Sequence, residues 1–299
     1  MEWTFWRVEL LEIMRLDIPM KQRTLGKEIV ISGIGLHTKE ITAIRLLPAK
    51  ENTGIVFSSS RGIIGADHSS LGDSFSTTGL TSDGFQVEGV EHILSALYGM
   101  FITNVEIVML NHEIPQGDGS SFVYVDAITS AGIVEQNASR LLFVVKKPVV
   151  IEEPERFISI TPSDNFTIDY SMGFPYPEIV HGEIEFTLSA CSYLSICGAR
   201  TWAERSHINR LHAMGRGKAL EGRCIIIEDG KIEEELRYED ETMRHKVLDC
   251  IGDLSLLYGM YILGRVRAHN AGHKLHHLLV KGLLDDSSYS SSRRVLRYS

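Results

Sequence analysis

The sequence predicts an α+β protein made of two similar halves. In each half, a run of strand-like segments is followed by a histidine-bearing helix, one strand and a last helix. The tetrapeptide Leu-Tyr-Gly-Met occurs at residues 97–100 and again at 257–260, each time late in or just after the histidine-bearing helix. This short match is a weak signal, but the parallel order of the elements is a stronger one. Together they favour two related α+β halves joined near residue 140.

The first half opens with alternating apolar residues, which predict a hairpin over residues 27–47 that turns at 33–37. Apolar residues three and four positions apart then predict a helix from Val90 to Met100. The other elements expected here are a strand at 54–57, a serine- and glycine-rich stretch at 58–84, a strand at 104–110, a polar loop at 111–121 and a second helix at 123–133.

Strand patterns resume after the polar residues 136–139, which separate the two halves. The strands expected in the second half are 141–150, 157–160, 166–170, 183–188 and 261–268, and its helices are 241–257 and 273–284. A segment of mixed pattern spans 201–227. We therefore predict a first domain at 20–138 and a second at 139–284, with an insert at about 202–227.

Both ends of the chain are expected to lie outside these domains. Residues 1–19 read as an unstructured N-terminal extension, with Met20 as an alternative start. Charged residues interrupt every apolar run in this extension, so it does not resemble a signal peptide. The tail at 285–299 is rich in serine and arginine, and we expect it to be flexible.

Composition excludes several classes of protein. Hydrophobic residues make up 43% of the 299 residues and charged residues 23%, which is enough for a packed core and unlike a disordered chain. The net charge of −9 argues against nucleic acid as a partner, although a local cationic pocket for a phosphorylated metabolite remains compatible with it. No apolar stretch is long enough to span a membrane. Four cysteines without metal-knuckle spacing favour reduced thiols and a cytoplasmic location.

Two helices carry residues that suit a metal site. His245 and Asp249 are four residues apart, so they lie on one face of a helix, and Glu91-His92 begins the other histidine-bearing helix. Taken alone, the first pair is more typical of a surface ion pair, and the histidine of the second is more typical of a buried interface residue. Together, two histidines and an aspartate would leave the fourth position of a tetrahedral zinc open, as in hydrolytic sites. Glu91 would then be placed to act as a general base.

Further along the chain, His273 precedes a helix and adds a titratable group, while Asp253 lies one turn beyond Asp249 and could orient a histidine. His273 is equally compatible with an ordinary residue at a helix start, and Asp253 with a solvated charge on a helix. The glycine-rich segments lack the spacing of a phosphate-binding loop, so we interpret them as tight turns. We expect the histidines without a paired carboxylate to be solvated: 207, 212, 276 and 277.

Several motifs occur in one order along the chain. They are Gly33-Ile34-Gly35-Leu36-His37, Val90-Glu91-His92-Ile93-Leu94-Ser95-Ala96-Leu97, Glu113-Ile114-Pro115 with Asp118-Gly119-Ser120, Ala199-Arg200-Thr201, residues 244–254 and Gly272-His273. From about Lys21 to Leu284 the chain resembles the UDP-3-O-acyl-N-acetylglucosamine deacetylases, zinc enzymes of lipid A biosynthesis. The resemblance implies an α+β fold in which the helices of two similar domains pack between two outer sheets. Each domain would have a mainly antiparallel sheet and two helices.

The resemblance also implies roles for individual residues. The Zn²⁺ ligands would be His92, His245 and Asp249. The catalytic residues would be Glu91 as general base, His273 as the protonated partner, Asp253 orienting that histidine and Thr201 stabilising the oxyanion, while Lys246 would bind anionic groups of the substrate. The implied substrate is an acylated UDP-N-acetylglucosamine, which loses its acetyl group in the cytoplasm. The oligomeric state does not follow from the sequence.

The chain departs from the family pattern after Thr201. Trp202-Ala203-Glu204 replaces a mostly apolar stretch, and residues 216–223 are more charged than the family's counterpart. In the family this insert builds a passage for the acyl chain, and a carboxylate at Glu204 would be costly beside a hydrocarbon. We therefore keep two alternatives. One is a deacetylase of a different amidosugar nucleotide, and the other is a non-catalytic module that binds a sugar nucleotide or an acyl chain.

Overall fold

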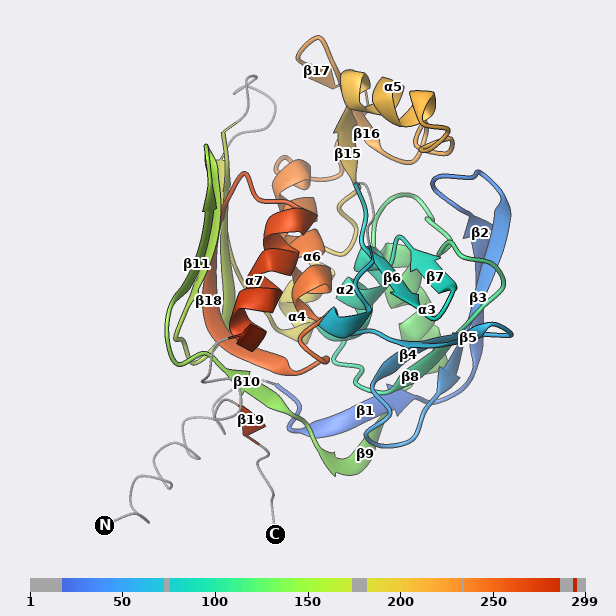
Figure 1. Cartoon of the computed structure of the whole chain (residues 1–299), viewed down its shortest axis with the longest axis vertical. Coiled ribbons are helices and arrows are strands. Elements are labelled where there is room, and N and C mark those ends of the chain that lie inside the picture. The colour runs from blue at the N-terminus through green and yellow to red at the C-terminus, as the bar shows by residue number, and fades with distance from the viewer. Residues whose placement is uncertain (1–17, 73–75, 174–181, 233, 286–292, 295–299) are drawn as a thin grey trace.

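The computed structural model describes residues 18–72, 76–173, 182–232, 234–285 and 293–294. Most of the predicted N-terminal extension, residues 1–17, lies outside the described residues. The described chain forms two large sheets with helices packed between them, and a small lobe projects beyond one end of the helices (Figure 1). None of the described helices is both long and apolar enough to cross a membrane.

The first half forms a five-stranded sheet. Its strands lie in the order β2 (Ile29–Ile34), β3 (Ile41–Pro48), β8 (Val105–Met109), β4 (Ile55–Ser59) and β5 (Gly62–Gly65). All neighbours are antiparallel except β8 and β4, which run parallel. The helices of this half are α2 (Glu91–Gly99) and α3 (Phe122–Ala131), which confirm the two predicted helices. α3 ends where Gly132 adopts a positive φ of 77°.

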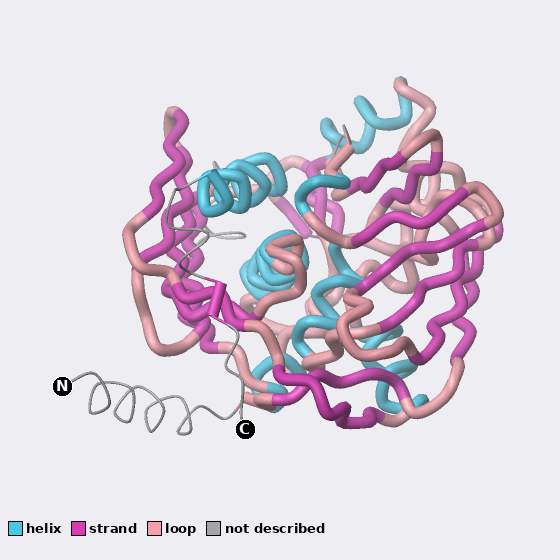
Figure 2. The backbone as a smooth tube through the Cα atoms, turned by 60° about the horizontal axis from the view of Figure 1, so that its bottom comes forward, coloured by secondary structure: helices cyan, strands magenta, loops and turns pink. Residues whose placement is uncertain are grey.

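The second half repeats this arrangement. Its corresponding strands are β11 (Val149–Glu153), β12 (Arg156–Thr161), β18 (Tyr261–His269), β13 (Phe166–Met172) and β14 (Gly182–Thr187). In each half, the strand that follows the histidine-bearing helix has one parallel neighbour among the five strands. This parallel pair is β8 with β4 in the first half and β18 with β13 in the second, and the other pairs are antiparallel. The helices are α6 (Glu241–Leu254) and α7 (His273–Asp285). Figure 2 shows the helices between the two sheets from a second direction. The predicted α+β fold with two similar halves is confirmed.

The structure differs from the predicted elements in several places. The expected strand at 141–150 is two strands, β10 (Leu142–Val144) and β11, because Pro148 has no N–H for a continuous ladder. The polar residues expected to separate the halves belong to β9 (Ile133–Ser139), which pairs with β1 (Lys21–Leu25). The serine- and glycine-rich stretch contains short elements that its composition concealed: β5, the 3-10 helix η1 (His68–Ser70) and β6 (Gly79–Ser82), which pairs with β7 (Phe85–Glu88) directly after the stretch.

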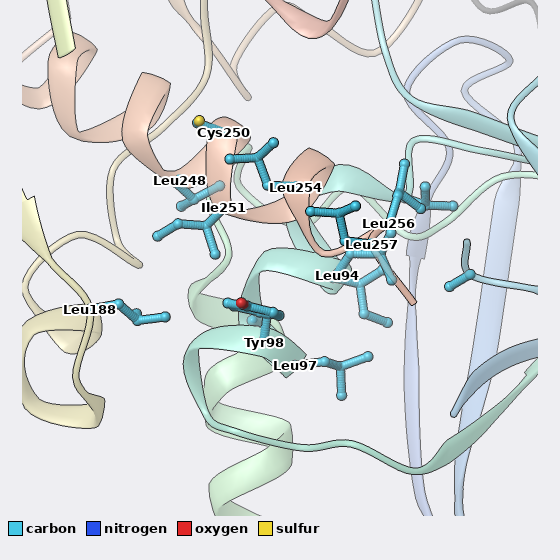
Figure 3. Close-up of a cluster of buried hydrophobic side chains, with 14 of the residues drawn as sticks. Leu94, Leu97, Tyr98, Leu188, Leu248, Cys250, Ile251, Leu254, Leu256 and Leu257 are labelled. Atoms are coloured by element: carbon cyan, nitrogen blue, oxygen red, sulfur yellow. The ribbon is translucent and has the colours of Figure 1, made fainter. Parts of the chain in front are cut away.

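The core lies where α2 packs against α6. Leu94, Leu97 and Tyr98 of α2 face a cluster of leucine and isoleucine side chains from α6 and the turn after it (Figure 3). A Cβ added to Gly252 of α6 would lie 2.1 Å from the backbone oxygen of Glu91, so only glycine permits this approach. The sequence therefore brings the start of α2 into direct contact with the last turn of α6.

The insert forms the projecting lobe. Its elements are β15 (Trp202–Glu204), α5 (Arg205–Ala213), β16 (Ile225–Glu228) and β17 (Lys231–Ile232), and its strands form a separate three-stranded sheet. This lobe has its own small hydrophobic cluster, to which Leu36 of the first half also contributes. The remaining described elements are α4 (Ala190–Leu194) and β19 (Arg293–Arg294), and β19 pairs with β10 inside the tail that the sequence predicts to be flexible.

Candidate active site

Three potential metal ligands converge where α2 begins and α6 passes beside it. Nε2 of His92 lies 3.4 Å from Oδ1 of Asp249, and Nε2 of His245 lies 3.2 Å from the same oxygen. The two imidazole rings meet edge to face with centroids 4.9 Å apart. One donor atom from each residue lies within 4.8 Å of the others, and all three residues are buried. The structure thus brings together the two histidines and the aspartate that the sequence singled out.

The donor atoms of His245 and Asp249 are in the chemical state that a metal requires. Nδ1 of His245 lies 3.0 Å from the carbonyl oxygen of Ala199, which accepts its proton and leaves the Nε2 lone pair free. Within the described part of the chain, neither that Nε2 nor Oδ1 of Asp249 makes a hydrogen bond. Burial lowers the pKa of His245. Burial opposes ionisation of Asp249, but His245 and Lys246 hold the pKa of its carboxyl well below the usual value. A neutral imidazole and an ionised carboxylate are ligand forms.

Glu91 is the buried carboxyl group beside this trio. It opens α2, only 4% of it is exposed, and burial raises its pKa. The backbone N–H of Thr78 donates a 2.9 Å hydrogen bond to Oε2 of Glu91 and so fixes the carboxyl group. A carboxyl group whose pKa is raised towards neutrality is suited to accept and return a proton.

His273 and Asp253 form a second buried pair. Nδ1 of His273 lies 2.7 Å from Oδ2 of Asp253. Burial lowers the pKa of His273, but Asp253 more than reverses that effect and raises it to about 10. Burial likewise opposes ionisation of Asp253, and His273 together with His277 holds the pKa of its carboxyl well below the usual value. At neutral pH this is an imidazolium paired with a carboxylate.

A cavity of about 220 Å³ connects these groups with the insert. Glu91, His92, Asp249 and His273 line its polar part. The rest of its wall is formed by Leu36, His37, Ser76, Thr77, Gln116, Thr201, Trp202, Ala203, His207, Leu211, Leu220 and Lys246. The cavity is therefore lined by both ionisable and apolar side chains, and the insert supplies most of the apolar ones.

Thr201 and Lys246 border the same cavity. Thr201 is held by backbone hydrogen bonds to Gly119 and Ile225, each 2.8 Å long. A Cβ added to Gly119 would lie 1.9 Å from the backbone oxygen of Arg223, so this glycine allows the base of the insert to pack closely. Nζ of Lys246 lies 3.0 Å from Oδ2 of Asp249 and 5.4 Å from the centre of the Trp202 ring.

Glu204 does not line the cavity. It immediately precedes α5, and its Oε2 accepts a 3.1 Å hydrogen bond from the hydroxyl of Ser206. Trp202 and Ala203 of the same strand do border the cavity. The departure in sequence after Thr201 thus puts an indole and a methyl group, rather than a carboxylate, beside the space.

Comparison with known proteins identifies the family. A family model described as UDP-3-O-acyl N-acetylglycosamine deacetylase matches residues 22–285. The chain belongs to this deacetylase family. A UDP-3-O-acyl-N-acetylglucosamine deacetylase from Campylobacter hominis is 38% identical over 275 residues, which are 90% of this chain and 93% of that protein.

Two other deacetylases of that name agree. The protein from Saccharophagus degradans is 37% identical over 280 residues, covering 89% of this chain and 90% of its own length. The protein from Wolinella succinogenes is 36% identical over 277 residues, covering 90% of this chain and 93% of its own length. The match with the family model includes every residue that lines the cavity, as well as the whole insert.

Two groups at this deacetylase site were missed by the sequence analysis. His276 was expected to be solvated, but it is fully buried with Nδ1 2.7 Å from Oδ2 of Asp253, so that expectation was wrong. Its position one turn after His273 on α7 was the available signal. Thr78 contacts both Glu91 and Asp253, and its hydroxyl lies 2.5 Å from Oδ1 of Asp253. Nothing in its local sequence distinguishes it from Thr77.

Proposed function

We propose that this protein catalyses the zinc-dependent hydrolysis of the acetamide of a UDP-3-O-acyl-N-acetylglucosamine. The products are acetate and UDP-3-O-acyl-glucosamine, and the reaction belongs to lipid A biosynthesis in the cytoplasm. One observation carries this proposal above all. A buried trio of metal-type ligands adjoins a cavity that is also lined by a carboxyl group of raised pKa and an imidazolium of raised pKa, in a member of this deacetylase family.

His92, His245 and Asp249 fit a metal ion because their facing donor atoms are buried and those of His245 and Asp249 have no hydrogen bond in the described chain. Two histidines and one carboxylate are a common ligand set of catalytic zinc. A zinc ion held there would polarise the acetamide carbonyl and lower the pKa of a bound water. Because the protein offers three ligands, the substrate has room to approach the fourth position.

Glu91 serves as the general base. Its Oε2 is held by the backbone N–H of Thr78, so the carboxyl group keeps one orientation towards the cavity. Since burial raises its pKa, the group takes a proton from the attacking water more readily than an exposed glutamate would. A positioned base of this kind typically contributes about 10²–10⁴ in rate.

His273 serves as the general acid. Asp253 binds Nδ1 and keeps the ring protonated, which leaves the Nε2 proton to be donated to the departing amine. Without this proton the glucosamine nitrogen would have to leave as an amide anion. The carboxylate of Asp253 therefore acts on the reaction through the charge and orientation of His273.

Thr201 and Lys246 complete the polar end of the cavity. The hydroxyl of Thr201 stabilises the tetrahedral oxyanion, an interaction often worth about 10²–10³ in rate for one donor. Lys246 offers a cation to the anionic groups of the substrate while it remains close to Asp249. The apolar wall formed by Leu211, Leu220 and Trp202 faces the acyl chain. Each methylene group buried there contributes about 0.8 kcal/mol to binding.

The test is an acetate-release assay on purified protein of known metal content. Three substrates are compared: UDP-3-O-acyl-N-acetylglucosamine, the same molecule without its acyl chain, and a nucleotide carrying a different acetamido sugar. We expect the acylated substrate to have the highest kcat/KM, loss of activity on chelation and recovery with zinc. Preference for the third substrate would support the alternative amidosugar deacetylase. Tight binding of the acylated substrate without acetate release from zinc-loaded protein would support a binding module.

A further inference from the structure

The insert sheet is not continuous with either large sheet, so its position over the cavity depends on other contacts. One segment of the insert, residues 216–219, lies against the first half of the chain. The backbone N–H of Ala219 donates to the carbonyl of Leu36 over 3.0 Å, and that of Lys218 donates to the carbonyl of His37 over 3.4 Å. This short segment and the turn at Leu36-His37 therefore join parts of the chain about 180 residues apart.

The side chain of His37 adds a third contact. The backbone N–H of Gly217 donates to Nδ1 of His37 over 3.3 Å, and this bond is buried. Burial, together with the charge of Arg216, lowers the pKa of His37, so its ring is neutral and can accept the proton. Gly217 has a positive φ of 69°, and an added Cβ would lie 2.8 Å from the side chain of Leu220. A larger residue would not fit here without strain.

An ion pair provides the fourth contact. The guanidinium of Arg216 binds Glu88 with distances of 2.9 Å and 3.5 Å between nitrogen and carboxylate oxygen atoms. Their side chains are 27% and 10% exposed, so water screens this pair less than it screens pairs on the open surface. Arg205 behaves differently, because its partners Glu221 and Glu228 both belong to the insert. Among these two arginines, only Arg216 ties the insert to the rest of the molecule.

The turn that receives the insert is itself firmly held. The carboxylate of Glu113 accepts the backbone N–H groups of His37 and Thr38 over 2.7 Å and 3.0 Å. A Cβ added to Gly35 would lie 2.3 Å from Oε2 of Glu113, which explains why glycine occupies that position. The two motifs around Gly35 and Glu113 thus build a rigid platform below the insert.

These contacts have a direct consequence for the cavity. Leu36 belongs to the hydrophobic cluster of the insert, and Leu36, Leu211 and Leu220 all line the apolar part of the cavity. We propose that residues 216–219 with Leu36, His37 and Glu88 form a clasp that fixes this apolar wall and so determines which acyl-chain lengths the cavity accepts. This proposal rests on the proposed deacetylation of an acylated substrate. Arg216 and Glu88 are positioning residues in it, since neither lines the cavity.

The first experiment needs no substrate. Hydrogen exchange is measured at the amides of Gly217, Lys218 and Ala219 in wild type, Arg216→Met and Glu88→Gln. The amide of Ile225, which binds Thr201 at the base of the insert, is the internal reference. We expect roughly three- to tenfold faster exchange at the three clasp amides and no change at Ile225. Equal exchange in wild type and both variants would overturn the clasp.

The second experiment measures KM and kcat for substrates of different acyl length. In both variants we expect KM to rise roughly three- to tenfold for long acyl chains and little for short ones. The kcat and the pH profile should be unchanged, because the acid and base lie on α2 and α7. The double variant Glu88→Arg/Arg216→Glu should restore much of the wild-type ranking, and Arg205→Met should leave it unchanged.

The two experiments separate the possible failures. Faster exchange with an unaltered acyl-length ranking would show that the clasp does not set specificity. A ranking altered equally by Arg205→Met would show that general weakening of the insert, and not the clasp, is responsible. If wild-type protein released no acetate from any acylated substrate, the proposed function would fail, while the exchange result would still decide whether the clasp exists.

Discussion

Helices α2 and α6 hold equivalent places in the two halves of the fold, yet they contribute different chemistry. α2 offers its functional residues, Glu91 and His92, in its first turn. α6 presents His245, Asp249 and Asp253 at intervals of four residues along one face. The two halves thus share the position of this helix but not the functional residues that the helix carries. The site forms because Glu91, the first residue of α2, packs directly against Gly252 in the last turn of α6.

The carboxyl groups of the two helices differ in their surroundings. Asp249 and Asp253 lie next to cationic or hydrogen-bonding partners, which hold their pKa values well below the usual range despite burial. Glu91 has burial as its largest influence, and its pKa is raised. Environment therefore separates two carboxylates of lowered pKa on α6 from one proton-accepting carboxyl group of raised pKa on α2. The variants below test this division.

The largest effect is expected from Asp249→Ala, which removes a proposed ligand on α6. Metal content and activity should be lost together, with a fall in kcat/KM beyond the roughly 10²–10⁴-fold typical of a lost general base. The measurement is zinc per chain by mass spectrometry alongside acetate release. Asp240→Ala removes an exposed carboxylate from the start of the same helix and should retain both. Full zinc occupancy in Asp249→Ala would contradict the assignment.

The next largest effect is expected from Glu91→Gln on α2. The amide has nearly the same shape, so zinc content should be normal while kcat falls by about 10²–10⁴. This result would contrast with that for Asp249→Ala: the substitution on α6 removes the metal, and the substitution on α2 leaves it in place. Near-normal turnover of zinc-loaded Glu91→Gln would show that the base lies elsewhere.

A smaller effect is expected from Asp253→Asn, and it concerns pH. His273 must be protonated for activity, so kcat/KM should fall as pH rises through its pKa, about 10 with Asp253 ionised. Removing the negative charge lowers that pKa, so the alkaline limb should move to lower pH, by roughly 1–3 units. The acid limb, which follows deprotonation of Glu91, should move less. An alkaline limb that stays in place would exclude His273 as the acid.

Much of this division could be predicted from the sequence. The i,i+4 spacing of His245 and Asp249 and the position of Glu91-His92 at a helix start placed the candidates on helices, and the structure puts them side by side. The roles of these residues remain predictions. The order of strand-rich and helical segments predicted the two-fold repeat, which the equal strand orders confirm.

Tertiary contacts explain what the sequence could not reveal. His276 lies one turn after His273, but only the packing of α7 on α6 shows that it is buried against Asp253. β9 is polar because most of its side chains face water, so alternation did not reveal it. The charges of the insert were expected to bear on the acyl passage, but Arg205 pairs within the insert and Arg216 reaches Glu88 across its boundary. Each case depends on contacts that are distant in sequence.

The smallest effect is expected from Thr78, which links the two helices. Its backbone N–H binds Glu91 of α2, and its hydroxyl binds Asp253 of α6. Thr78→Val keeps the first contact and removes the second, so the base should remain fixed while the acid pair loses one hydrogen bond. A hydrogen bond to a charged group contributes about 1.5–3 kcal/mol, so a fall in kcat of roughly 10- to 150-fold is the upper range expected if the whole contribution is lost in the transition state. Thr78→Ser keeps the hydroxyl, so its kcat should stay close to that of wild type.

Both Thr78 variants should bind zinc normally, and the comparison is between their kcat values measured at equal zinc content. If valine and serine gave the same kcat, the hydroxyl would have no part in holding Asp253, and only the backbone of Thr78 would connect α2 with α6.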